Sequence, residues 1–179
     1  MNRGGIRIVR IFGITIRVDW SWLIILALVT WNLSRVFGRV RPDRNAALTW
    51  GLSLAAALLF FTSVLVHELA HSLVARWRGI PVDEITLFLF GGVSEIEEQP
   101  DTPGGEFLMA ILGPVTSVIV GFIFLVLAGM AGARVTLQGD PGAVVGDPEG
   151  TLSQLTAMTT LLVWLGSINI ILGVFNMVP

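Results

Sequence analysis

The fold is decided by residues 46–77, which read AALTWGLSLAAALLFFTSVLVHELAHSLVARW. This stretch is apolar over more than the roughly 20 residues that a helix needs to cross the hydrocarbon core of a bilayer. Three further apolar stretches are long enough for the same purpose, at residues 20–37, 107–131 and 152–178. We therefore predict four transmembrane helices that are surrounded by the lipid bilayer.

The composition indicates the same fold class, an all-α membrane protein. Hydrophobic residues make up 54% of the 179 residues and charged residues only 13%, whereas an average soluble domain carries roughly 25% charged residues. A soluble domain of this size could not bury so much apolar surface, and a disordered chain needs the opposite composition. The net charge of −2 gives no support for a nucleic-acid partner, and the lack of Cys excludes disulfides, thiolate zinc sites and cysteine nucleophiles.

Three local signals interrupt the helical pattern. Within residues 1–18, apolar side chains recur at even positions on either side of Phe12-Gly13, and period two is typical of strands. We therefore predict a short amphipathic β-hairpin at the membrane surface there. Gly113-Pro114 predicts a kink or a helix start in the third apolar segment, and the Gly-, Pro- and Asp-rich residues 132–150 predict a solvated loop.

Both histidines of the chain lie in one stretch of the second apolar segment, His67-Glu68-Leu69-Ala70-His71. Residues four apart share one face of a helix, so both imidazoles can reach one metal ion. Glu68 projects about 100° around the helix from His67, where its carboxylate can take a proton from a water molecule without binding the metal. Two nitrogen ligands and a carboxylate base are the arrangement of zinc hydrolases. The alternative is a structural polar cluster that pairs with Arg76 or with a neighbouring helix.

A second hairpin is predicted at residues 84–98, between the second and third helices. Two strand-like runs there are joined by Gly91-Gly92, which we take as the turn. Because non-helical backbone at membrane depth is tolerated only against protein or water, we expect this hairpin beside the catalytic cleft. An edge strand can bind an extended peptide by strand addition, which makes Ile85, Leu87 and Leu89 candidate substrate-binding residues. The alternative is a hairpin that only shields the site.

At these residues the chain resembles the site-2 protease family, zinc metalloproteases that cut within membranes. Four pieces, in the family's order, carry the resemblance: His67 to His71, Phe90-Gly91-Gly92, Gly113-Pro114-Val115-Thr116-Ser117, and Asn169 to Pro179.

The resemblance implies an intramembrane zinc endopeptidase, built as one transmembrane domain over residues 1–179. It implies that His67 and His71 bind Zn²⁺ and that Glu68 is the general base. Its substrates would be membrane-anchored proteins that are cut within or beside their spanning helix, in the cell membrane of a prokaryote. The resemblance also places Asn176 near the site, where it would bind substrate or an oxyanion; a role in helix packing is the alternative.

One departure from the family's pattern concerns the third zinc ligand. In the family, the Asn-x-x-Pro stretch continues to an Asp-Gly pair whose Asp binds zinc, about eight residues past Asn176. No Asp or Glu follows Glu149 in this chain, which stops at Pro179. We therefore expect the N-terminal piece of a longer enzyme, followed by further membrane segments and, as in some members, CBS modules. This piece alone is expected to be inactive or to bind zinc weakly. Two non-catalytic alternatives are a membrane zinc-binding or transport protein and an inactive protease homologue.

Overall fold

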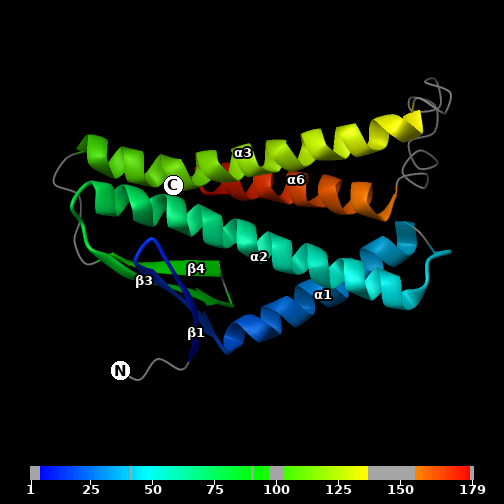
Figure 1. The fold of residues 1–179 in the computed structure, drawn as a ribbon, viewed down its shortest axis with the longest axis horizontal. Coiled ribbons are helices and arrows are strands. Elements are labelled where there is room, and N and C mark those ends of the chain that lie inside the picture. Colours follow the sequence, from blue (N-terminus) through cyan, green and yellow to red (C-terminus); the bar gives the residue numbers. More distant parts are fainter. Residues whose placement is uncertain (1–4, 41, 90, 97–102, 137–155, 178–179) are drawn as a thin grey trace.

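A computed structural model describes residues 5–40, 42–89, 91–96, 103–136 and 156–177. The described residues contain four long helices (Figure 1): α1 Ser21–Val40, α2 Ala46–Trp77, α3 Pro103–Thr136 and α6 Ala157–Phe175. Each contains a segment long and apolar enough to cross a membrane. The predicted fold class is therefore confirmed. Residues 152–155 and 178 of the predicted fourth segment lie outside the described residues, as do residues 137–150 of the predicted loop. The prediction of a loop is wrong for residues 132–136, which belong to α3.

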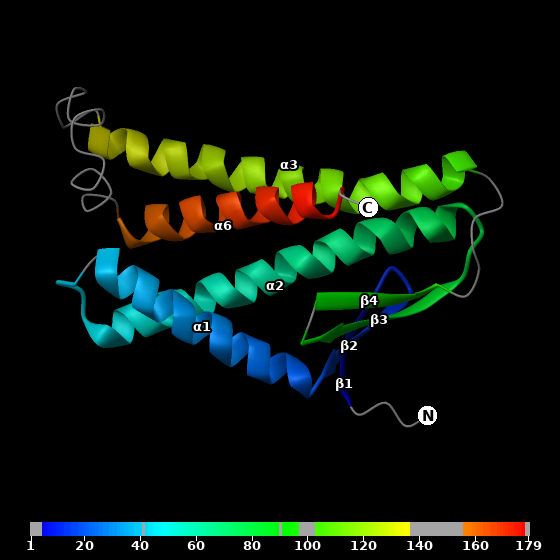
Figure 2. The same ribbon diagram turned by 180° about the vertical axis from the view of Figure 1, so that it is seen from behind.

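α2 lies in the middle of the bundle, with α1 on one side and the pair α3 and α6 on the other (Figures 1 and 2). A buried cluster joins α1, α2 and α6 through Leu33, Phe37, Ala56, Ala57, Leu161 and Leu165. α3 and α6 approach so closely that a Cβ added at Gly121 would lie 2.8 Å from the carbonyl oxygen of Gly166. Small residues at such contacts let the backbones of membrane helices pack directly.

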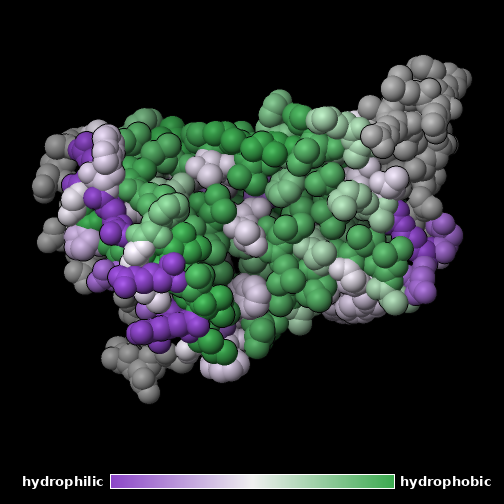
Figure 3. Space-filling model, in the orientation of Figure 1, coloured by the Kyte–Doolittle hydropathy of each residue, from purple (hydrophilic) through white to green (hydrophobic). Residues whose placement is uncertain are grey.

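The face of the bundle drawn in Figure 3 is apolar along its middle and hydrophilic towards its two ends. Large apolar side chains of the helices, such as Phe122, Met130 and Trp31, are exposed. This distribution is typical of a protein whose middle faces lipid and whose ends face water.

The predicted N-terminal hairpin is present as β1 Gly5–Ile11 and β2 Ile14–Asp19, which pair antiparallel. Phe12 and Gly13 form its turn with φ values of 50° and 81°, the left-handed conformation of a type I′ turn. Ile14 and Ile16 of β2 are buried, whereas Ile6 of β1 remains exposed. Only half of the predicted apolar face is therefore buried, because β1 is the outer strand of the sheet.

The second hairpin consists of β3 Val82–Phe88 and β4 Gly91–Ile96. The prediction that Gly91-Gly92 forms its turn is wrong. Gly91 pairs with Phe88 and Gly92 with Leu87, so both glycines belong to β4. Gly91 has a φ of 129°, a conformation that glycine adopts without strain and that lets the strand begin immediately after the turn.

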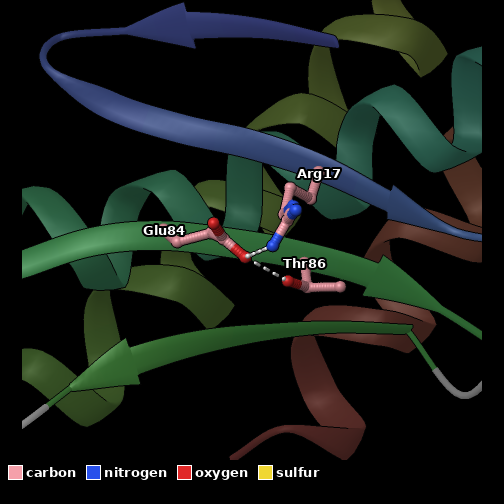
Figure 4. A network of polar contacts seen from close by, with 3 residues as sticks. All are labelled: Arg17, Glu84 and Thr86. Atoms are coloured by element: carbon pink, nitrogen blue, oxygen red, sulfur yellow. Dashed lines mark hydrogen bonds and ion pairs between the residues drawn. The ribbon is translucent and has the colours of Figure 1, made fainter. Parts of the chain in front are cut away.

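The two hairpins form one four-stranded sheet in the order β1-β2-β3-β4, because β2 and β3 pair in parallel. The helical hairpin of α1 and α2 is the long crossover that a parallel pair requires. On the outer face, Arg17 of β2 forms an ion pair of 3.3 Å with Glu84 of β3, which also accepts a hydrogen bond from Thr86 (Figure 4). On the inner face, Ile14, Ile16 and Ile85 pack against Leu69 of α2.

Two contacts attach the sheet to the ends of helices. At the end of α2, Arg76 donates a hydrogen bond to the carbonyl oxygen of Phe12 in the β1–β2 turn. At the start of α1, the Ser21 Oγ accepts a hydrogen bond of 3.2 Å from the Leu89 N–H. Hydrogen bonds from the Ser21 side chain and backbone in turn lower the pKa of the Asp19 carboxyl. The β3–β4 turn is therefore fixed to the first helix.

Candidate metal centre and active site

His67 and His71 lie one turn apart on α2 and point their Nε2 atoms at each other, 3.1 Å apart. With Zn–N bonds of 2.0–2.1 Å and tetrahedral angles, two nitrogens on one ion lie about 3.3 Å apart. The two imidazoles are therefore already placed as two ligands of one ion would be. His67 is almost fully buried, so the pair lies inside the bundle rather than on the lipid-facing surface.

A row of residues on α3, spaced four apart, contacts both rings. The His71 Nδ1 lies 2.5 Å from the Met109 carbonyl oxygen, and the His67 Nδ1 lies 2.8 Å from the Ser117 Oγ. Between them, a Cβ added at Gly113 would overlap the His71 ring. α3 runs through Pro114 without a break, so the predicted helix start is wrong and all three residues stay on one helix face.

Hydrogen bonds at both Nδ1 atoms indicate how the pair is oriented. A carbonyl oxygen only accepts, so the His71 Nδ1 carries the proton and the neutral ring keeps its lone pair on Nε2. A metal-binding histidine usually makes a hydrogen bond through its other ring nitrogen, and this bond orients the ring. Of the structural alternative, the pairing with Arg76 is absent from the described contacts, where Arg76 donates its hydrogen bond to Phe12, whereas the pairing with a neighbouring helix is present at α3.

Glu68 lies against β4. A Cβ added at Gly92 would be 2.5 Å from the Glu68 Cγ, so only a glycine at this position lets the strand approach the side chain so closely. A cavity of about 360 Å³ opens beside them. It is lined by α1, α2, the β3–β4 turn and the end of α6, through residues that include His67, Glu68, Leu89, Gly92, Leu172 and Asn176.

The structure brings only some of the predicted substrate-binding residues to this cavity. Leu89 and Asn176 line it, and the Asn176 side chain also donates a hydrogen bond to the Leu172 carbonyl oxygen at the end of α6. Ile85 and Leu87 do not line the cavity, because both are buried on β3, which pairs with β2 on one side and β4 on the other. Their prediction as an edge strand is wrong. Among the described strands, β4 is the outer one at the cavity.

Sequence reasoning assigned no role at the metal centre or the base to Met109, Gly113, Ser117 or Gly92. The spacing of four between Gly113 and Ser117 was the available signal, since it places a position without a side chain and a hydroxyl group on one helix face. Within the described residues, no group of three or more His, Cys, Asp or Glu side chains is placed to hold a metal ion.

The four membrane-length helices and the convergent histidine pair are features of a multi-pass membrane protein with a candidate metal site. Residues 55–179 match Peptidase family M50. The chain is 38% identical over 174 residues to sll0528 of Synechocystis sp. and 35% identical over 178 residues to Rip3 of Mycobacterium tuberculosis, both named as zinc metalloproteases. These matches cover 97% and 99% of this chain.

The fold also matches the site-2 protease from Methanocaldococcus jannaschii, with a TM-score of 0.61 and 28% identity over 98% of this chain. The chain belongs to Peptidase family M50. It spans 40% of the length of the two relatives and 65% of the archaeal structure.

The residues present fit the zinc that the names of the relatives imply. Imidazole nitrogen is a preferred zinc ligand, and the two Nε2 atoms converge at a spacing that suits one ion. Both rings are also held at Nδ1 by α3, as zinc-binding histidines are.

Proposed function

We propose that this chain forms the zinc-binding part of an intramembrane endopeptidase, which hydrolyses peptide bonds of membrane-anchored proteins in a prokaryotic cell membrane. The observation that carries the proposal is the convergence of the His67 and His71 Nε2 atoms, 3.1 Å apart, next to Glu68 at a cavity inside an apolar bundle. Ionisable groups in a membrane interior are costly and therefore indicate function.

His67 and His71 would hold the ion through their Nε2 atoms. When bound, zinc polarises the scissile carbonyl and lowers the pKa of water towards about 7. Glu68 takes one proton from the attacking water as the water oxygen bonds to the carbonyl carbon. It then gives that proton to the leaving amine nitrogen as the C–N bond breaks, so the carboxylate is regenerated. Both transfers need Glu68 at a fixed position, which its contact with β4 supports.

The cavity walls suit an extended apolar peptide. Ile25, Val29, Phe60 and Leu172 supply apolar contacts, and His67, Glu68 and Asn176 are polar groups of the same cavity. A peptide leaving its own helix loses its backbone hydrogen bonds and needs new partners in a membrane. We propose that β4 supplies them by strand addition, and that the Asn176 side chain positions the peptide near the reacting carbonyl.

Replacing the base tests the proposal in the complete natural protein. Glu68→Gln keeps the shape of the side chain but cannot accept the proton, so cleavage of a tagged single-span membrane protein should fall about 10²- to 10⁴-fold. Zinc content, measured by atomic emission, should not change. Glu106→Gln is the matched control, because Glu106 is exposed in the first turn of α3.

Both non-catalytic alternatives give a result that differs from that of the proposal, because neither predicts cleavage by the parent protein. A zinc-binding or transport protein retains zinc in the parent but cleaves nothing. An inactive homologue also fails to cleave, with or without zinc. Cleavage by Glu68→Gln at the parent's rate would exclude Glu68 as the base.

A further inference from the structure

A continuous row of hydrogen-bonding groups runs from α3 through α2 and back to α3. The Ser117 Oγ lies 2.8 Å from the His67 Nδ1, the two Nε2 atoms are 3.1 Å apart, and the His71 Nδ1 lies 2.5 Å from the Met109 carbonyl oxygen. Ser117 and His67 are 1% and 3% exposed. Because bulk water cannot satisfy such buried groups, each needs a donor or acceptor from the protein.

The two ends of the row differ in what they permit. At one end, the Met109 carbonyl oxygen only accepts, so the His71 ring carries its proton on Nδ1. At the other end, the Ser117 hydroxyl either donates or accepts. The position of the proton on the neutral His67 ring therefore depends on which role Ser117 takes.

Two arrangements of the ring protons fit these contacts: the first satisfies both Nε2 atoms without an ion, and the second leaves both Nε2 lone pairs for one ion. In the first, Ser117 donates to the His67 Nδ1, and the His67 Nε2–H donates to the lone pair of His71; a separation of 3.1 Å suits this N–H···N bond. In the second, the His67 Nδ1–H donates to Ser117, and both Nε2 lone pairs point at one place. Going from the first to the second removes a proton from Nε2 and adds one at Nδ1, so the total charge of the ring is unchanged.

We propose that Ser117 is a positioning residue for His67. Its hydroxyl donates to the His67 Nδ1 when the site holds no ion and accepts from it when His67 and His71 bind zinc. The inference rests on the proposed function, because it takes zinc as the ion that needs both lone pairs. Ser117 holds the His67 ring in the same place in either arrangement. The ligand pair is therefore preorganised before the ion arrives, which lowers the cost of ordering two side chains on binding.

The position of the His67 proton can be measured directly. In the complete protein labelled with ¹⁵N-histidine and held in detergent micelles, long-range ¹H–¹⁵N spectra report which ring nitrogen carries the proton. The signals missing from a His67→Asn variant identify His67. In protein stripped of metal, the His67 proton should be on Nε2 and the His71 proton on Nδ1. After zinc ion is added, both should be on Nδ1.

Zinc affinity gives a second readout, from competition with a chromophoric chelator. Ser117→Ala should weaken zinc binding about 10- to 100-fold, the usual effect of losing such a partner. The helix should be retained, because Ala has the highest helix propensity. Thr116→Ala is the matched control. It removes the neighbouring hydroxyl, which is bonded to the Leu112 carbonyl oxygen, and should leave zinc affinity unchanged.

The outcomes separate this inference from the proposed function. If the parent protein binds no zinc, the proposed function fails. If it binds zinc and the His67 proton stays on the same nitrogen throughout, the inference fails alone. Ser117→Ala with the zinc affinity of the parent would also overturn it.

Discussion

The two sides of the cavity are built in different ways. On the helical side, α3 fixes both histidine rings through Met109, Gly113 and Ser117, which lie on one helix face. On the sheet side, Glu68 lies against a single backbone position of β4, Gly92. The proposed metal ligands and the proposed base thus depend on separate elements. Substitutions on α3 and on β4 should therefore damage different steps.

The largest effect is expected on the helical side, from Gly113→Ala. The added Cβ would overlap the His71 ring, so His71 must leave its position and one of the two proposed ligands is lost. Zinc content, measured by atomic emission, should fall to the background of a His71→Ala variant, and cleavage should fall with it.

A second glycine of the same helix provides the control. Nothing lies within 4 Å of a Cβ added at Gly129, so Gly129→Ala should retain zinc. It should also stabilise the helix by about 0.5–1 kcal/mol, since Ala loses less entropy than Gly on folding. If Gly113→Ala kept its zinc as Gly129→Ala does, the contact with His71 would not matter for binding the ion.

The next effect is expected on the sheet side, from Gly92→Ala. The new methyl group would lie 2.5 Å from the Glu68 Cγ, so the carboxylate or the strand must shift. Displacing a catalytic group by about 1 Å costs about 10²-fold in rate. Cleavage should fall by that order while zinc content stays at the level of the parent.

Val93→Ala is the control on the same strand, because Val93 is about half exposed and should tolerate truncation. The comparison between the two sides breaks down if Gly92→Ala loses zinc along with activity. In that case β4 would support the metal site as well as the base.

The sequence predicted those parts of the molecule that depend on local geometry. The long apolar runs predicted the four helices, and the spacing of His67 and His71 predicted that both rings reach one point, because four residues make about one helical turn. The turn at Phe12-Gly13 was also predicted, because it too depends on neighbouring residues in the sequence.

What was missed depends on contacts between distant segments. The parallel pairing of β2 with β3 makes β3 an interior strand, and nothing in the alternation of Ile85, Leu87 and Leu89 distinguishes an interior strand from an edge. The hydrogen bond between Ser117 and His67 also joins residues 50 positions apart. Helix periodicity assigns each of them a face but does not say which faces meet.

The smallest effect is expected at the outer edge of β4. Adjacent backbone N–H groups of a strand point to opposite edges, so Val93 and Ser94 direct one N–H towards β3 and one away from it. Val93→Pro and Ser94→Pro therefore form a matched pair. One proline removes a hydrogen bond inside the sheet and should lower the thermal unfolding midpoint.

The other proline removes the N–H on the outer edge of β4, which we propose binds the substrate strand. It should leave the unfolding midpoint and the zinc content unchanged but slow cleavage about 3- to 10-fold, since one hydrogen bond contributes about 0.5–1.5 kcal/mol. Strand addition at β4 is wrong if the stable member of the pair cleaves at the rate of the parent. The sheet would then shape the cavity around Glu68 without binding the peptide backbone.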